Sequence, residues 1–144
     1  MARNSERRHV AERLHSAAIH VLRYARQADR NSAIGPAQLS ALSVLVYGGS
    51  RNLRELADAE QVAAPTMTRI VAALRRGGYV RLKRSPDDAR SSIVEATAKG
   101  SAALEKARAA RLDLIDGLLS DCAHADIALL GKALAAIFPQ EASS

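Results

Sequence analysis

Residues 64–100 read APTMTRIVAALRRGGYVRLKRSPDDARSSIVEATAKG, and the first third of this stretch has the periodicity of a helix. Its apolar positions follow the spacing i, i+3, i+4 and i+7: Met67, Ile70, Val71 and Leu74. This spacing places them on one face of a helix and leaves polar and basic residues on the other. The glycine pair at 77 and 78 ends the helix. The pattern predicts an amphipathic helix with one buried face.

The residues after the glycines predict a β-hairpin. Residues 79–84 alternate apolar and basic side chains, as a strand does, and residues 91–97 form a weaker second strand. Pro86, Asp87 and Asp88 supply the turn between them. From Ala64 through Pro86 there are six Lys or Arg residues and no Asp or Glu. A basic helix followed at once by a basic hairpin is typical of a winged helix-turn-helix that grips DNA.

The composition of the whole chain agrees with a duplex DNA partner. In 144 residues, 21 Lys and Arg face 15 Asp and Glu, which gives a net charge of +6 and favours a polyanionic partner. Aromatic residues make up only 3%, which argues against single-strand binding on stacking platforms. One cysteine excludes a disulfide framework and a CxxC metal site. The chain has no apolar N-terminal leader and no run able to span a bilayer, so we expect no membrane partner and a cytoplasmic location.

Helices are predicted on both sides of this stretch. The first covers residues 6–28 with an apolar stripe at Val10, Leu14, Ala17, Val21 and Ala25. A second starts at Pro36 and ends at Gly48-Gly49-Ser50, with Leu39, Leu42 and Val46 as its apolar marks, and a short third carries Leu53, Leu56 and Ala57. After the hairpin a long helix starts at Ala98. A last helix, capped by Ser120 and closed by Pro139, turns Ile127, Leu130, Leu134 and Ile137 inward.

This order gives a mainly α fold with a small β-hairpin wing: a winged helix-turn-helix with N- and C-terminal dimerisation helices. We expect a single domain over residues 1–144. Residues 36–97 form the DNA-binding lobe, and residues 6–34 and 98–138 form the dimerisation helices. The terminal helices are too apolar along one stripe to stand alone, so a homodimer is expected. A monomer that folds these helices back on itself is the alternative.

The outward residues of the recognition helix are the first candidates for DNA contact. Helix residues near the N-terminus reach base edges in the major groove; here they are Pro65, Thr66, Thr68 and Arg69. Arg75 and Arg76 lie at the other end and are expected to touch the backbone. The alternative is a solvated basic helix face.

At the hairpin tip, the candidates are Arg84, Asp88 and Arg90. A hairpin can lower an arginine into the narrow minor groove. Asp88 and Arg90 are two residues apart and would share a face of a strand, so we expect Asp88 to orient Arg90 by a charge-assisted hydrogen bond. The alternative is an ordinary surface ion pair.

The ordered motifs resemble those of the MarR family, the multiple-antibiotic-resistance regulators. Asp88-Ala89-Arg90, five residues, Ala96-Thr97, two residues and Gly100 follow the wing signature D-x-R-x5-L-T-x2-G. Upstream, the segments at 36–39, 53–57, 66–69 and 74–80 stand in the family's order and spacing, so the resemblance covers about Val10 to Phe138. Ala96 replaces the usual Leu, Ala89 a residue that is often basic, and Ala63-Ala64 the polar cap before the recognition helix.

The resemblance implies a homodimeric transcription factor, usually a repressor, that binds a pseudo-palindromic double-stranded operator. A small effector, often aromatic or phenolic, commonly lodges between the dimer helices and the DNA lobe and releases DNA. Candidate effector residues are His20, Tyr24 and Tyr47, for which packing is the alternative role. No cofactor is implied.

Other residues suggest chemistry that the pattern does not support. Cys122 is placed in the first turn of the last helix, where a thiol can become redox-active, although Asp121 opposes the thiolate. His9 and His20 share a helix face but lie about 16 Å apart, so no metal site is predicted. No catalytic motif is present, and we expect no enzyme. The alternative function is a winged-helix protein-interaction or architectural module without ligand-controlled repression.

Overall fold

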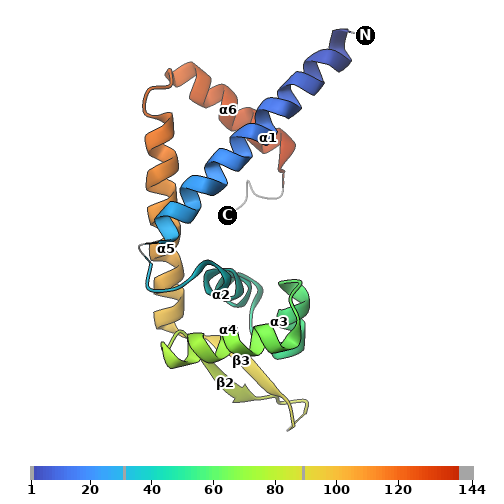
Figure 1. The fold of residues 1–144 in the computed structure, drawn as a ribbon, viewed down its shortest axis with the longest axis vertical. Coiled ribbons are helices and arrows are strands. Elements are labelled where there is room, and N and C mark those ends of the chain that lie inside the picture. Colours follow the sequence, from blue (N-terminus) through green and yellow to red (C-terminus); the bar gives the residue numbers. More distant parts are fainter. Residues whose placement is uncertain (1, 31, 89, 140–144) are drawn as a thin grey trace.

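The computed structural model describes residues 2–30, 32–88 and 90–139, and it is mainly helical. The element order is α1 (Ala2–Asp29), α2 (Pro36–Gly48), β1 (Arg51–Asn52), α3 (Leu53–Ala59), α4 (Ala64–Arg76), β2 (Val80–Arg84), β3 (Ser92–Ala96), α5 (Ala98–Leu119) and α6 (His124–Ile137). Figure 1 shows α2, α3, α4 and the sheet gathered at one end, which we call the lobe. The terminal helices α1, α5 and α6 extend away from it. The mainly α fold with a β wing is confirmed.

Local sequence signals explain where the lobe helices begin. Pro36 occupies the first turn of α2, as expected. Asn52 caps α3: its side chain accepts from the Glu55 N–H at 2.8 Å, and the Glu55 carboxylate accepts from the Asn52 N–H at 3.0 Å. This reciprocal capping box fixes the entry into the helix-turn-helix. By contrast, α4 follows Ala63, which provides no side-chain cap.

The sheet has three antiparallel strands in the order β1-β3-β2, one more than the hairpin predicted from sequence. Arg51 and Asn52 pair with Val94 and Ile93. A two-residue strand is too short to show alternation, which is why periodicity missed it. In the hairpin, Leu82 lies opposite Val94 and Arg81 opposite Glu95.

The core of the protein lies inside the lobe. Its most deeply buried side chains come from α2, α3, α4, β3 and the turn before α2: Ile34, Leu39, Leu42, Leu56, Met67, Leu74 and Val94. Of the predicted inward residues of α4, Met67, Val71 and Leu74 are buried and Ile70 packs against them half-buried. The N-terminal half of α5 closes the core with Leu104 and Ala107.

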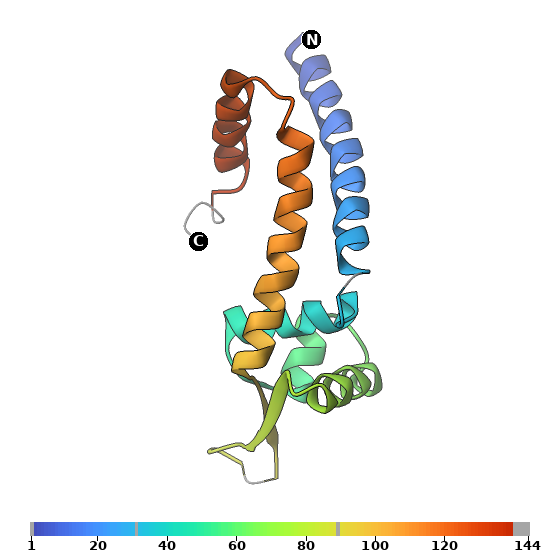
Figure 2. The ribbon, with the colours of Figure 1, turned by 90° about the vertical axis from the view of Figure 1, so that its left-hand side faces the viewer.

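The terminal helices pack differently. Helix α1 runs along α5 (Figure 2), and Arg111 of α5 joins Asp29 of α1 through an Nε–Oδ1 contact of 2.8 Å. The single chain leaves Val10, Leu14 and the apolar residues of α6 exposed, because its described residues provide no element that covers them. Their burial against a second chain stays a prediction. Among the described residues, no helix is long and apolar enough to cross a membrane.

The turn between α5 and α6 also corrects the sequence analysis. Ser120 ends α5, with its hydroxyl donating to the Gly117 carbonyl at 2.9 Å, and Ala123 precedes the first turn of α6. Cys122 therefore lies exposed in the turn before α6 rather than in its first turn. The competing hydrogen bond to the α5 carbonyl keeps Ser120 from capping the next helix.

Candidate nucleic-acid interface

Helix α4 presents a polar face opposite the face that it buries. Pro65, Thr66, Thr68 and Arg69 are all exposed. The Thr68 hydroxyl donates to the Ala64 carbonyl at 2.9 Å, which leaves its lone pairs and its methyl group for an outside partner. Pro65 lacks an N–H and Ala63 has no capping side chain, so the first turn is not closed by a polar side chain. This geometry suits a recognition helix.

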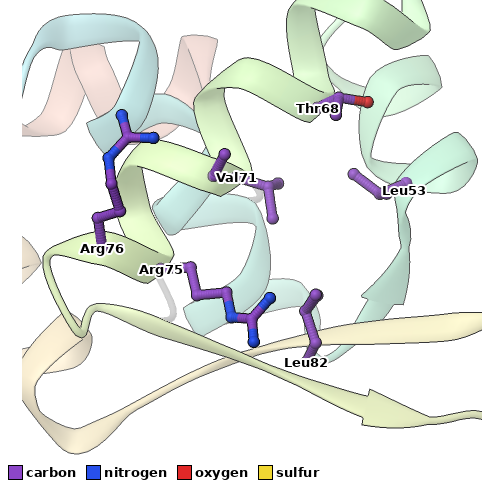
Figure 3. A pocket seen from close by; sticks show the side chains of 7 residues that line it. Leu53, Thr68, Val71, Arg75, Arg76 and Leu82 are labelled. Atoms are coloured by element: carbon purple, nitrogen blue, oxygen red, sulfur yellow. The ribbon is translucent and has the colours of Figure 1, made fainter.

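A hollow of about 500 Å³ separates the C-terminal half of α4 from the wing. Figure 3 shows its lining, with the Arg75 side chain reaching toward Leu82 of β2 while Arg76 lies farther along the helix. Leu53, Val71 and Ala72 make its apolar floor. Arg75 and Arg76 therefore stand at the rim between the recognition helix and the hairpin.

The wing tip holds Arg84, Asp88 and Arg90 together as predicted, but the contact between Asp88 and Arg90 differs. The Asp88 Oδ1 atom accepts from the backbone N–H of Arg90 at 2.9 Å. Within the described residues, no ion pair joins the two side chains. Both residues lie in the turn rather than on a strand, so they need not share a face. Asp88 thus shapes the turn backbone as an Asx-type contact and leaves the Arg90 guanidinium exposed.

Within β2 and β3, Glu95 is the one acidic residue, and it lies beside basic residues of β2. Its Oε2 atom accepts from Arg81 Nε at 2.5 Å and from Lys83 Nζ at 2.7 Å. These hydrogen bonds, Arg81 first and then Lys83, lower the pKa of Glu95 to about 2. The remaining arginines of this surface form no ion pair within the part of the chain that the structure describes: Arg69, Arg75, Arg76, Arg84 and Arg90.

The turn from α4 into β2 is tied to the start of α5. Lys99 Nζ donates to the Gly77 carbonyl at 2.7 Å and lies 4.9 Å from the centre of the Tyr79 ring. The Thr97 hydroxyl donates to the Gly78 carbonyl at 2.7 Å. Gly78 adopts a φ of +77°, and a Cβ on Gly100 would come within 2.1 Å of the Tyr79 carbonyl oxygen. The base of the wing and the end of α4 are therefore fixed to the first turn of α5.

A second hollow of about 460 Å³ lies beside this junction, where the end of α1 meets α5. Its apolar lining includes Ile34, Tyr79 and Ala103, and Lys99 and Lys106 also line it. Neither His20, Tyr24 nor Tyr47 lines this hollow. Tyr47 instead donates its hydroxyl to Glu105 Oε1 at 2.9 Å, and this hydrogen bond raises the pKa of Tyr47. A ligand role for the three residues stays a prediction.

The three-helix lobe, its recognition helix and its basic hairpin define a winged helix-turn-helix protein. A model of the MarR family matches residues 34–91. An HTH-type transcriptional regulator of Mycobacterium leprae is 35% identical over 104 residues, 69% of this chain and 73% of that protein. A regulator of Mycobacterium tuberculosis is 33% identical over 102 residues, 71% of each. The chain belongs to the MarR family of DNA-binding transcriptional regulators, and it is not an enzyme.

Solved structures share the fold over nearly the whole chain. The transcriptional regulator Tm0710 of Thermotoga maritima has a TM-score of 0.79 and 26% identity, covering 95% of this chain and 99% of that one. Wild-type MarR of E. coli has a TM-score of 0.71 at 22% identity, covering 90% and 96%. MepR of S. aureus, solved as a mutant bound to an oligodeoxyribonucleotide, has a TM-score of 0.72 at 16% identity, covering 90% and 96%.

Sequence reasoning missed three features of this surface. Glu95 was not singled out, although strand register places it opposite Arg81. Leu53 was expected to turn inward and Leu82 was one of the alternating apolar residues of the strand, yet both line the hollow between α4 and the wing. Lys99 lies just past the wing signature and gave no local signal, because its partners Gly77 and Tyr79 are about twenty residues upstream.

Proposed function

We propose that the protein is a homodimeric repressor that binds a pseudo-palindromic operator and releases it when a small effector binds. The main support for this proposal is the basic surface of α4 and the wing. Five arginines without ion-pair partners in the described chain stand on the recognition helix and the wing, while α4 buries its opposite face in the core. Unpaired cations on one face of a winged helix are what phosphate and groove contacts require.

Each candidate residue takes a role that follows from its place. Thr66, Thr68 and Arg69, next to Pro65 on the exposed first turns of α4, read base edges in the major groove. Arg75, Arg76 and Arg84 contact phosphates. Arg90 enters the minor groove from the wing tip, and Asp88 supports it by holding its backbone N–H.

The terminal helices support the homodimer. Their large apolar side chains stay exposed in the single chain, including Leu14, Leu22, Leu118, Leu130, Leu134 and Ile137. Contiguous apolar surface of this kind marks a protein interface. Two-fold pairing through these helices places two lobes on one side of the dimer. The lobes then reach half-sites about 34–36 Å apart, the distance of one helical turn.

The hollow between α1 and α5 is the proposed effector site. Its apolar lining suits an aromatic molecule, and Lys99 and Lys106 favour an acidic or phenolic group on it. Lys99 also holds the end of α4. A ligand that binds better when the lobes are spaced wrongly for DNA lowers DNA affinity by the same factor.

The DNA assignment is tested by footprinting the protein on genomic DNA and titrating the recovered site. Arg69→Ala is expected to lose about 1–3 kcal/mol of discrimination at one base position. Arg84→Ala, which removes a proposed phosphate contact, is expected to weaken binding to every sequence and to lower the salt slope by about 1. Arg108→Ala, on α5, is the matched control. Undiminished binding by both lobe variants would favour another surface and a protein-interaction role.

The effector assignment is tested separately by filling the hollow. Ala102→Trp occupies it, whereas Ala109→Trp alters another exposed alanine of α5 that does not line it. A panel of aromatic acids and phenols is screened for release of the footprinted DNA. The first variant is expected to keep DNA binding and lose release, and the second to keep both. Release that survives Ala102→Trp contradicts this site.

A further inference from the structure

The basic residues of β2 are divided between the two faces of the wing. Arg84 shares a face with Val80, which is buried, and with Leu82, which lines the hollow against α4. Arg81 and Lys83 alternate with them and therefore lie on the opposite, outer face of the wing. Position along the strand thus decides which cations stand on the α4 side.

Glu95 lies on the same outer face as Arg81 and Lys83. It lies directly opposite Arg81 in the register, and a single oxygen atom of its carboxylate accepts from both outer cations, at 2.5 Å from Arg81 Nε and 2.7 Å from Lys83 Nζ. The Glu95 side chain is 26% exposed, about half as much as either basic partner. Two flexible cations are therefore drawn back onto one half-buried anion between them.

The cations of α4, the α4-facing side of the wing and the tip have no such partner. Within the described residues, Arg69, Arg75, Arg84 and Arg90 form no ion pair. Its two donors lower the pKa of Glu95 to about 2, so the carboxylate is ionised at neutral pH. The surface therefore carries two populations of cations, one free and one held.

We infer that Glu95 restrains DNA affinity by keeping Arg81 and Lys83 from phosphate contacts. Each lysine or arginine that neutralises a phosphate adds a counterion-release term that does not depend on sequence. Such a term strengthens binding to all genomic DNA and lowers the advantage of the operator. The carboxylate thus limits non-specific binding while the arginines on the α4 side remain available.

Glu95→Gln tests this directly, because it keeps the shape of the side chain and removes its charge. The probe is a labelled mixed-sequence duplex of about 30 base pairs, titrated between about 50 and 200 mM salt. Since non-specific binding is measured, no operator is needed. The slope of log affinity against log salt is expected to steepen by about 0.9 for one freed cation and about 1.8 for both, and low-salt affinity should rise severalfold.

Two controls separate release of these cations from a general charge effect. Glu12→Gln removes the same charge and frees Arg8 from a pair on α1, at the far end of the molecule from the wing (Figure 1), and should leave the slope unchanged. Arg81→Gln with Lys83→Gln should change little in the wild type but cancel the gain in Glu95→Gln. Thermal melting confirms that each variant is folded.

Every other outcome overturns the inference. An unchanged slope in Glu95→Gln means that the held cations cannot reach phosphates. Weaker binding means that Glu95 instead aims Arg81 and Lys83 at DNA. An equal gain in Glu12→Gln assigns the effect to net charge. A wild-type protein that binds no duplex at any salt concentration would contradict the DNA-binding role itself, and this result differs from all of the others.

Discussion

The lobe and the terminal helices use their apolar residues in opposite ways. In the lobe, Leu42, Leu56, Met67 and Val94 are closed off from solvent by elements of the same chain. On α6, all the apolar residues stay exposed, and Leu129 reaches 67%. The lobe and the first half of α5 bury one core within the single chain. The terminal helices leave their apolar side chains exposed, which is the surface that the proposed dimer would cover.

The largest expected effect comes from placing charge on the exposed apolar stripe of α6. Leu130→Asp with Leu134→Asp should convert the proposed dimer into monomers, because two carboxylates cannot be buried unpaired at an interface. Operator affinity should fall at least about a hundredfold, since the second lobe no longer binds within the same complex. Sedimentation gives the mass and a titration gives the affinity.

The same helix offers a control for that experiment. Lys132→Asp changes an exposed polar residue of α6 between the two leucines, on the far side of the helix, and should leave the mass unchanged. The lobe of the double variant should keep its fold. A wild-type protein that already sediments as a monomer would show that the exposed stripe serves another purpose.

The next largest effect is a loss of stability in the lobe core, and this loss should not depend on protein concentration. Met67→Ala removes a fully buried side chain and is expected to lower the free energy of unfolding by about 2–5 kcal/mol. The loss reflects both reduced burial and the cavity that remains. Urea denaturation at two protein concentrations measures it. A loss that shrinks with rising concentration would mean that the lobe core also depends on the partner.

The contrast between the two parts marks how far sequence alone could go. The periodicity of α4 identified its buried face because Met67, Val71 and Leu74 meet their partners within one chain. The same rule also found the apolar stripes of α1 and α6. Periodicity shows which residues share a face of a helix, but not which chain covers that face. The strand and turn pattern placed Arg84 and Arg90 at the hairpin tip, where Arg84 ends β2 and Arg90 lies in the turn.

The details of two turns and the contacts between distant segments could not be predicted from the sequence. The predicted charge-assisted hydrogen bond between the side chains of Asp88 and Arg90 is wrong, because the turn lets the carboxylate accept the backbone N–H of Arg90 instead. Cys122 and Ser120 were misplaced by three residues of helix boundary, since the first cap candidate bonds to the preceding helix. Lys99 and Glu95 needed the register of the strands and the path of α5.

A smaller effect is expected where the two parts join. Asp29 is 8% exposed and accepts from Arg111 Nε. Asp29→Asn removes the charge that faces this guanidinium and should cost about 1–3 kcal/mol. Arg8→Gln, in an exposed pair, is the matched comparison, worth at most about 1 kcal/mol. Equal losses of stability in the two variants would show that the Asp29–Arg111 contact contributes no more than an exposed ion pair.

The smallest effect concerns the contact between Tyr47 of α2 and Glu105 of α5. The Tyr47 hydroxyl donates to Glu105, and this raises its pKa above the ordinary value of 10.0. A raised folded-state pKa means that the contact contributes fully below pH 10.0 and is lost as the pH rises through the higher, folded-state pKa. The melting temperature of the wild type should therefore fall more steeply above that pH than that of Tyr47→Phe, which has no proton to lose. Because Tyr47 is exposed, the difference should be slight; parallel curves for the two proteins would show that α2 and α5 are held together by the lobe core alone.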